Sequence, residues 1–224
     1  MTPDERALLR DAAAHVLLDD IEMVTLDDDS AHHLFRVLRV RDGEIVTVTD
    51  GSGGWRVCRS AGGVLEPNGP VCRDERTTEP ARIAVAVPKR DRPEWIVQKL
   101  TELGVDEITL LHADRSVVRW DPERADKHRR KLGKVMAEAL QQSRGVWLPS
   151  LVGPVDASAV LNEFAVAEPG GRPITDRDRA VAIGPEGGWS EAELSAAADQ
   201  VGLGATVLRV ETAALAVASR LRLR

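Results

Sequence analysis

The sequence predicts an α/β fold in which a parallel sheet is covered on both faces, with a smaller β-rich module before it. From residue 82 onwards, short apolar runs alternate with amphipathic helical segments, which is typical of parallel strands joined by crossover helices. The apolar runs show little alternation, as expected for strands buried on both faces. Before residue 75 the pattern changes to short alternating strands separated by glycine-rich turns.

The N-terminal module is predicted from two segments. Residues 44–60, EIVTVTDGSGGWRVCRS, indicate two short strands around a Gly-Ser-Gly-Gly turn, because valines alternate with threonines. Residues 30–44, SAHHLFRVLRVRDGE, predict a short helix that ends near Gly43 and carries Arg36 and Arg39 on one face. Residues 64–72, VLEPNGPVC, continue with turn residues, and the polar residues 73–82 predict a linker.

The larger part of the chain is predicted as a series of strands and helices. The long helix has a buried stripe at Leu132, Val135, Met136, Ala139 and Leu140. The predicted strands are 82–88, 107–113, 180–184 and 205–210. The first predicted helix lies within 90–106, with Pro93 in its first turn and Gly104 at its C-terminal stop. The other predicted helices are 121–143, a short one near 156–164, 190–202 and 212–224.

Composition limits the function. The chain has 224 residues, 43% of them hydrophobic, and a net charge of −6. No apolar stretch is long enough to span a bilayer, and the charged N-terminus lacks an apolar signal core. Cys58 and Cys72 make no disulfide framework, and no other metal-ligating residues are grouped with them in the sequence. We therefore expect a reduced, cytoplasmic protein without a structural metal. The acidic balance argues against a protein that coats nucleic acid. The basic runs at 36–41 and 127–131 are candidates for local RNA contacts, but charge alone favours the alternative that both are solvated faces.

A glycine-rich loop follows one of the predicted strands. Residues 181–194, VAIGPEGGWSEAEL, place Gly187 and Gly188 where a ligand can lie against the backbone, and Ser190 with Glu193 forms a capping box for the next helix. The loop matches neither a P-loop nor a dinucleotide fingerprint, and Glu186 would repel phosphate. It suits a nucleoside with hydroxyl and amine groups; the alternative is a purely structural turn.

A second strand-to-helix corner occurs about 25 residues later. Residues 203–216, LGATVLRVETAALA, run through a polar segment into a helix of small residues, with Thr212 as a candidate N-cap. Because ligands bind beyond the carboxyl ends of parallel strands, the two corners are expected to flank one pocket.

Taken together, these motifs resemble the 16S ribosomal RNA uracil-N3 methyltransferases (RsmE type) of the SPOUT superfamily. The segments IGPEGGWSEAE and LGATVLRVETAALA are the most similar. HHLFRVLRVRDGEIVTVTDGSG resembles the PUA-like RNA-binding domain of that family, and VPKRDRPEWIVQKLTELGVDEITLLHADRSVV and AEALQQSRGVWLP resemble parts of its catalytic domain. The resemblance covers nearly the whole chain, with four motifs in the same order.

The resemblance implies an N-terminal PUA-like β-barrel domain, residues 1–75, and a C-terminal SPOUT α/β domain with a deep trefoil knot, residues 76–224. It implies a homodimer and S-adenosylmethionine as methyl donor. The residues implied to bind that cofactor are Gly184, Pro185, Glu186, Gly187, Gly188, Leu203, Gly204, Leu208, Thr212 and Ala213. Ala167 and Glu168 match a third loop of the family.

The implied substrate is a uridine of 16S ribosomal RNA within the small subunit. Methylation at N3 requires loss of the N3 proton and stabilisation of the resulting anion, for which Arg209 and Glu211 are candidate catalytic residues. Arg144 is a third candidate, although the family places its arginine one position later, where this chain has Gly145. An ion pair that holds a loop is the alternative for Arg209 and Glu211, and a cation at a helix C-terminus is the alternative for Arg144. RNA binding is expected at Arg36, Arg39 and Arg41.

Two other functions remain open from the sequence. A knotted methyltransferase of this kind can act on another RNA, such as transfer RNA. A non-catalytic RNA-binding or assembly protein with the same fold is the other alternative, and the intact glycine loop and LRVETAA segment argue against it.

Overall fold

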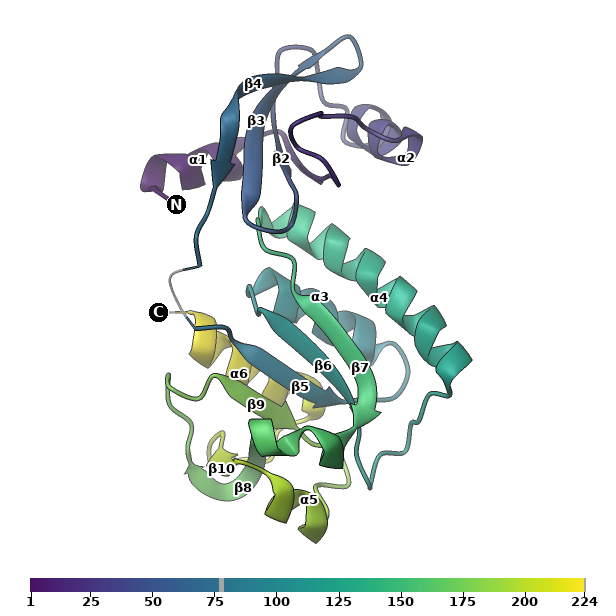
Figure 1. Cartoon of the computed structure of the whole chain (residues 1–224), viewed down its shortest axis with the longest axis vertical. Coiled ribbons are helices and arrows are strands. Elements are labelled where there is room, and N and C mark those ends of the chain that lie inside the picture. The colour runs from purple at the N-terminus through teal and green to yellow at the C-terminus, as the bar shows by residue number, and fades with distance from the viewer. Residues whose placement is uncertain (77–78, 224) are drawn as a thin grey trace. The chain divides into compact units, whose positions relative to one another are not determined.

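The computed structural model describes residues 1–76 and 79–223, so part of the predicted linker, residues 77 and 78, lies outside the described residues. The chain divides into two compact units (Figure 1). Unit 1 comprises the described part of Met1–Thr78 together with Ala137–Leu148, and unit 2 comprises Glu79–Met136 with Pro149–Arg224 as far as residue 223. Within the described ranges, no helix combines the length and apolar character needed to cross a membrane.

Unit 1 is built on a four-stranded sheet in the order β1-β2-β3-β4. Strand β1 (Ala14–Leu17) pairs in parallel with β2 (Ile45–Thr49), and β2 and β3 (Gly54–Ala61) form the predicted antiparallel hairpin. Helix α1 (Pro3–Asp11) precedes the sheet and begins with a capping box. The hairpin prediction is therefore confirmed, because the alternating valines lie in the core of this unit.

Two predictions for unit 1 are wrong. Residues 64–72 were expected to form turns, but β4 (Val64–Arg73) is a continuous strand that pairs with β3, and a register shift accommodates its prolines. The predicted helix is α2 (Asp28–His32) followed by the π-helical turn η1 (His33–Val37), so it ends before Gly43. Arg39 has a φ of 58° and lies beyond the helix, so Arg36 and Arg39 do not share a helix face.

The end of helix α4 (Pro122–Ser143) and the segment that follows it belong to unit 1. The Gly53 amide donates to the Val146 carbonyl at 2.8 Å, and the Leu148 amide donates to the Gly51 carbonyl at 2.8 Å. These two hydrogen bonds attach residues 146–148 to the turn of the hairpin. Residues far apart in the sequence therefore complete this unit.

Unit 2 contains a six-stranded sheet in the order β10-β8-β9-β5-β6-β7, in which every pairing is parallel. Its strands are β5 (Arg82–Ala86), β6 (Glu107–His112), β7 (Ser150–Asp156), β8 (Ala165–Pro173), β9 (Ala180–Ile183) and β10 (Asp199–Gly202). The predicted parallel sheet is confirmed.

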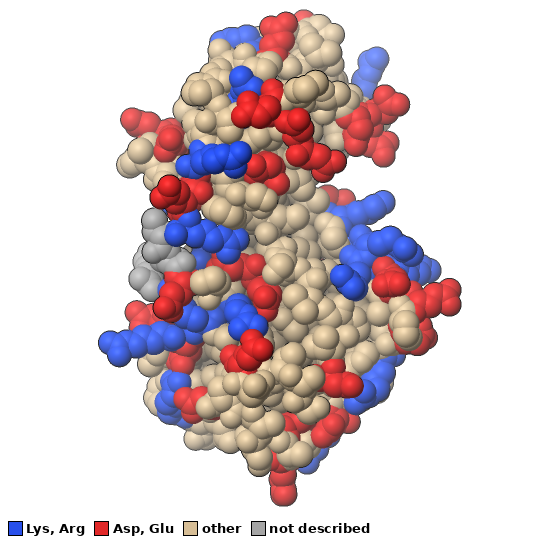
Figure 2. Space-filling model, in the orientation of Figure 1, with Lys and Arg blue, Asp and Glu red and all other residues tan. Residues whose placement is uncertain are grey.

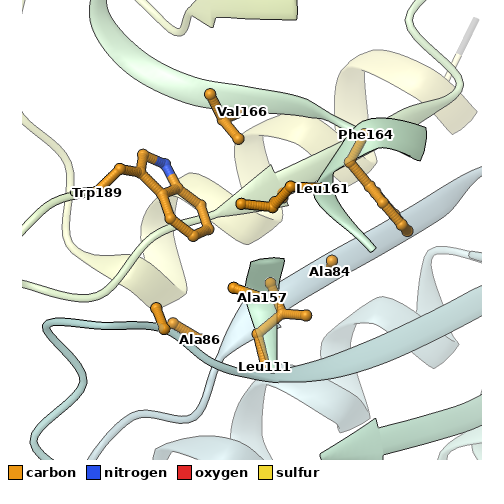
Figure 3. Packing of buried hydrophobic residues seen from close by; sticks show 10 residues of the cluster. Ala84, Ala86, Leu111, Ala157, Leu161, Phe164, Val166 and Trp189 are labelled. Carbon is orange, nitrogen blue, oxygen red and sulfur yellow. The ribbon is translucent and has the colours of Figure 1, made fainter. Parts of the chain in front are cut away.

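Both faces of the sheet in unit 2 are covered. On one face a cluster that includes Ala84 and Ala86 of β5, Leu161, Phe164 and Trp189 packs with the short helix α5 (Glu191–Ala196) (Figure 3). The turns η2 (Ala157–Ala159) and η3 (Leu161–Glu163) contribute to this layer. Helix α6 (Val210–Arg222) packs against β5, β9 and α3 (Arg92–Glu102) on the opposite face, to which the alternate residues of β5 point.

The capping box that the sequence predicted after the glycine loop is confirmed. Ser190 Oγ accepts a hydrogen bond from the Glu193 amide at 3.2 Å, and Glu193 Oε2 accepts one from the Ser190 amide at 2.8 Å. Glu193 is buried, and its other oxygen accepts from the Asp114 amide at 2.9 Å. The start of α5 is thus held to the loop that follows β6, which fixes the far end of the glycine loop.

Several elements of unit 2 differ from the sequence prediction. The predicted helix 190–202 ends at Ala196, and its last residues form β10. Residues 205–209, predicted as part of a strand, have no regular structure, and Val207 is 86% exposed. The helix expected near 156–164 consists of the two 3-10 turns η2 and η3. Strands β1, β7 and β8 were not predicted.

Candidate functional site

The two motifs identified in the sequence line one cavity of about 640 Å³ in unit 2. We call it the glycine-loop cavity. It is bounded by part of β8, by the loop after β9 and by the segment that connects β10 to α6. Its lining residues are Ala167–Gly170, Ile183–Glu186, Gly188, Trp189, Leu203–Val210 and Ala213. The volume lies in the range of small-molecule and cofactor sites.

Glycines leave the main chain of this cavity uncovered. Gly170 and Gly204 have φ values of 90° and 134°, a region that disfavours other residues. An added Cβ at either position would meet no atom within 4 Å, so the space beside these two Cα atoms is open. At Gly184 the opposite holds, because an added Cβ would lie 2.9 Å from the indole of Trp189. The cavity wall therefore combines exposed backbone with a closely packed tryptophan.

Most of the predicted cofactor residues lie on this cavity. Those that line it are Gly184, Pro185, Glu186, Gly188, Leu203, Gly204, Leu208 and Ala213. Gly187 and Thr212 are outside the lining set. The carbonyl of Gly187 instead accepts a hydrogen bond from Arg115 at 3.3 Å. The expectation that Thr212 caps the last helix is wrong, because Arg209 is the N-cap residue of α6 and caps it without a side-chain hydrogen bond.

Some lining residues were missed by the sequence reasoning. Trp189 lies within the glycine-loop motif but is not among the predicted site residues, yet its ring lines the cavity and its Nε1 donates to the Ala167 carbonyl at 3.2 Å. This bond joins the glycine loop to β8. Pro169 and Gly170, next to the loosely matched Ala167 and Glu168, also line the cavity. Their proximity to the loop depends on the β8–β9 pairing, for which the sequence carries no local signal.

Arg92 forms ion pairs with two carboxylates, Glu186 and Glu211, beside the glycine-loop cavity. Arg92 Nη1, at the start of α3, donates to Glu186 Oε1 at 3.0 Å and lies 3.8 Å from Glu211 Oε2. Glu211 Oε2 is buried and has no hydrogen-bond partner among the described residues. Arg209 is exposed on the cavity wall. The ion pair of Glu211 therefore runs to Arg92 and not to Arg209, and the sequence did not single out Arg92.

Arg144 belongs to unit 1 and lines a second cavity there, of about 660 Å³. It has a φ of 60°, and its Nη2 donates to the Ala12 carbonyl at 3.0 Å. Partial burial lowers the pKa of this guanidinium. His15 lines the same cavity, with Nδ1 2.8 Å from Thr47 Oγ1 and Nε2 2.8 Å from the Gly145 carbonyl. Burial lowers the pKa of His15 to about 4.

The basic runs lie on exposed surfaces. Arg36, Arg39 and Arg41 are all exposed in unit 1. In unit 2, Lys and Arg side chains gather along α4, as Figure 2 shows, and Lys131 pairs with Glu94 at 2.7 Å. Acidic side chains are interspersed over the rest of the face drawn in Figure 2. Apart from the Lys131–Glu94 pair, the basic side chains of both runs are exposed to solvent.

Comparisons with protein families agree with this geometry. Residues 75–222 match the model of an RNA methyltransferase domain, and residues 26–59 match that of an RNA methyltransferase PUA domain. A ribosomal RNA small subunit methyltransferase E from Mycobacterium bovis is 32% identical over 228 residues, covering 88% of this chain and 85% of the relative. The protein of the same name from Bacillus subtilis is 27% identical, with 88% and 89% covered.

Solved structures give the same result. A ribosomal RNA small subunit methyltransferase E from Neisseria gonorrhoeae, bound to S-adenosyl methionine, superposes with a TM-score of 0.74 at 25% identity and covers 92% of this chain and 95% of that chain. A methyltransferase from Legionella pneumophila, in complex with the cofactor SAM, also has a TM-score of 0.74, with 27% identity and 93% and 95% covered.

Proposed function

We propose the detailed function of this chain from the premise that it belongs to the RNA methyltransferase family that contains ribosomal RNA small subunit methyltransferase E. It is an S-adenosylmethionine-dependent methyltransferase with an α/β catalytic domain and a PUA-like domain, and it acts on ribosomal RNA. We propose that the acceptor is N3 of a uridine in 16S ribosomal RNA. The observation that supports this proposal is that the two sequence motifs, 181–194 and 203–216, both line the glycine-loop cavity.

The glycine-loop cavity fits S-adenosylmethionine. Open backbone at Gly170 and Gly204 leaves space that any side chain would fill. Apolar side chains such as Leu203 and Leu208 suit an adenine ring, and the carboxylates of Glu168 and Glu186 suit hydroxyl and ammonium groups. When bound, this cofactor would supply a methyl group carried on a sulfonium sulfur. The sulfur is the leaving group and keeps the electron pair of the C–S bond. We assign its binding to the lining residues that the sequence predicted.

The chain must remove a proton and stabilise an anion. We assign removal of the N3 proton to the carboxylate of Glu211, which has an unsatisfied oxygen. Arg209, on the cavity wall, donates hydrogen bonds to a uracil oxygen that gains negative charge. Arg144, with its guanidinium bound only to a carbonyl among the described residues, is kept as the third catalytic candidate.

We assign RNA contacts outside the reaction centre to Arg36, Arg39 and Arg41. All three are exposed, and two of them flank the end of a helical segment within the match to the PUA domain model. Exposed arginine side chains are common hydrogen-bond donors to the negatively charged phosphate oxygens of RNA. The proposed division into an RNA-binding domain, residues 1–75, and a catalytic domain, residues 76–224, follows the positions of the two family matches.

The resemblance described above also supports four finer proposals. These are a trefoil knot in the catalytic domain, a homodimer, action on the small ribosomal subunit and a cytoplasmic location. Light scattering coupled to gel filtration tests the dimer, with a mass near twice 24.3 kDa expected. A monomer at micromolar concentration would contradict it.

The experiment that tests the proposed function measures transfer of labelled methyl groups from S-adenosylmethionine to small ribosomal subunits that lack their native methylations. Mass spectrometry of the nucleosides is expected to find 3-methyluridine. Incorporation into transfer RNA alone, or another methylated nucleoside, would contradict the assignment. Calorimetry that measures the binding of S-adenosylmethionine distinguishes a methyltransferase of any RNA substrate from a non-catalytic protein, which would bind no S-adenosylmethionine.

Single variants then test the three catalytic candidates. Arg209→Ala, Glu211→Gln and Arg144→Ala are each expected to lower kcat, with the affinity for S-adenosylmethionine nearly unchanged for the last two. Arg177→Ala is the matched control, because Arg177 is an exposed arginine in the loop between β8 and β9 and outside the cavity lining. Wild-type kcat in any of the three variants would remove that residue from the mechanism.

A further inference from the structure

A smaller cavity of about 340 Å³ lies in unit 2 and is lined by Asp91, Arg92, Trp95 and Glu211. We call it the Trp95 cavity. Trp95 is 41% exposed, whereas Trp55, Trp120 and Trp189 are each 5% exposed or less. Its position in the first turn of α3 places an indole on the wall of this cavity. An exposed aromatic ring of this kind is the usual platform on which proteins stack an unpaired base.

An ion pair connects the Trp95 cavity to the glycine-loop cavity. Arg92 lines the first, Glu186 lines the second, and their side chains are hydrogen-bonded at 3.0 Å. Glu211 lines the Trp95 cavity and is followed along α6 by Ala213, which lines the glycine-loop cavity. A molecule on Trp95 is therefore next to a molecule in the glycine-loop cavity, as methyl transfer between them requires.

Arg92 and Glu211, two of the three charged groups that line the Trp95 cavity, complement part of the edge of uracil. That edge presents a carbonyl acceptor, the N3–H donor and a second carbonyl acceptor. Arg92 is a donor, and the Glu211 carboxylate is an acceptor that still lacks a hydrogen-bond donor at Oε2. A buried carboxylate oxygen without a hydrogen-bond donor lowers the stability of the folded protein. Such an unsatisfied oxygen is expected where a bound ligand supplies the missing donor. Cytosine has an acceptor at N3, so the carboxylate would repel it.

We propose that the Trp95 cavity is the subsite for the acceptor base, in which an unstacked uracil lies on Trp95. Arg92 donates to one uracil carbonyl, Glu211 accepts from N3–H, and the other carbonyl is left to Arg209. This inference rests on the proposed function and extends it to two residues, Arg92 and Trp95, that discriminate and position the base.

The first test compares Trp95→Ala with Trp95→Phe in methyl transfer to undermethylated small subunits. Loss of stacking is expected to lower kcat/KM by about 5- to 150-fold in Trp95→Ala. Trp95→Phe keeps a ring and is expected to retain most activity. Both variants are expected to bind S-adenosylmethionine as the wild type does. Wild-type kcat/KM in Trp95→Ala, or equal damage in the two variants, would overturn the inference.

A second test does not depend on turnover, so it separates this inference from the proposed function. The full chain is mixed with a cytidine 12-mer that carries one 4-thiouridine, irradiated, and the adduct is mapped by mass spectrometry. We expect the adduct on the peptide that contains residues 91–95. An adduct confined to other peptides, or none, would overturn the subsite even if the protein methylates RNA.

Base preference provides the last measurement. An unlabelled 12-mer with uridine at the labelled position is expected to compete with the cross-link better than one with cytidine there. In Glu211→Gln the preference is expected to disappear, because an amide offers both a donor and an acceptor to N3. Arg177→Ala serves as the control and is expected to keep it. Equal competition by both 12-mers in the wild type would contradict the role of Glu211 in reading the base.

Discussion

Replacement of Gly184 by alanine tests the packing that shapes the glycine-loop cavity. The added Cβ would lie 2.9 Å from Trp189 Cε2 and 3.0 Å from Nε1, closer than carbon atoms approach without displacement. Trp189 is 3% exposed and packs among the buried residues of Figure 3. Its Nε1 also donates to the Ala167 carbonyl. The indole therefore has neither free space nor a spare partner if it is pushed away.

The cost follows from two contributions. Overpacking of a core by a methyl group costs about 1–3 kcal/mol. Weakening of the Trp189–Ala167 hydrogen bond adds about 1 kcal/mol. The free energy of unfolding of Gly184→Ala is expected to fall by about 2–4 kcal/mol, with Tm lower by about 4–16 °C for a chain of this size. Because Gly184, Trp189 and Ala167 all line the cavity, the affinity for S-adenosylmethionine is expected to fall as well.

The matched control is Gly133→Ala. Gly133 lies within α4, where an added Cβ would meet no atom within 4 Å. Alanine is expected to raise the free energy of unfolding there by about 0.5–1 kcal/mol, since glycine is a poor helix former. Urea denaturation followed by circular dichroism measures both variants, and calorimetry measures cofactor affinity. A Gly184→Ala midpoint at or above that of the wild type would refute the reasoning, because the indole would have moved without cost.

Three further outcomes are expected. His15 has a pKa of about 4 when folded and about 6.5 when unfolded, so its contribution to stability is complete above pH 6.5 and is lost as the pH falls towards 4, by at most about 3 kcal/mol. Urea titrations across this range should show that loss in the wild type and a smaller one in His15→Gln. Asp178→Asn is expected to lower the free energy of unfolding by about 1–2 kcal/mol in urea denaturation, because the carboxylate of Asp178 pairs with Arg172, whose guanidinium is partly exposed. In single-turnover assays Glu211→Gln is expected to slow methyl transfer by about 10²- to 10⁴-fold, and a wild-type rate would exclude Glu211 as the base.

The sequence predictions were wrong mainly where a strand pairs with another strand that is distant in the sequence. The helix expected over 190–202 stops at Ala196, because residues 199–202 pair with β8 as β10, and short strands with polar residues carry little local signal. The strand expected at 205–210 does not form, since these residues line the glycine-loop cavity and Val207 points to solvent. Proline and glycine in β4 indicated turns, yet its pairing with β3 prevails through a register shift.

The sequence by itself determined the class of the fold and the two loop motifs that line the glycine-loop cavity. Apolar runs, helix periodicity and the Ser190–Glu193 capping box are local patterns, and each is set by neighbours within a few residues along the chain. The contacts that make the site specific join distant residues: Arg92 meets Glu186 and Glu211, and Trp189 meets Gly184 and Ala167. Such contacts depend on the order of strands in the sheet, which decides which loops become neighbours. Only the tertiary structure could therefore show the Trp95 cavity beside the glycine loop.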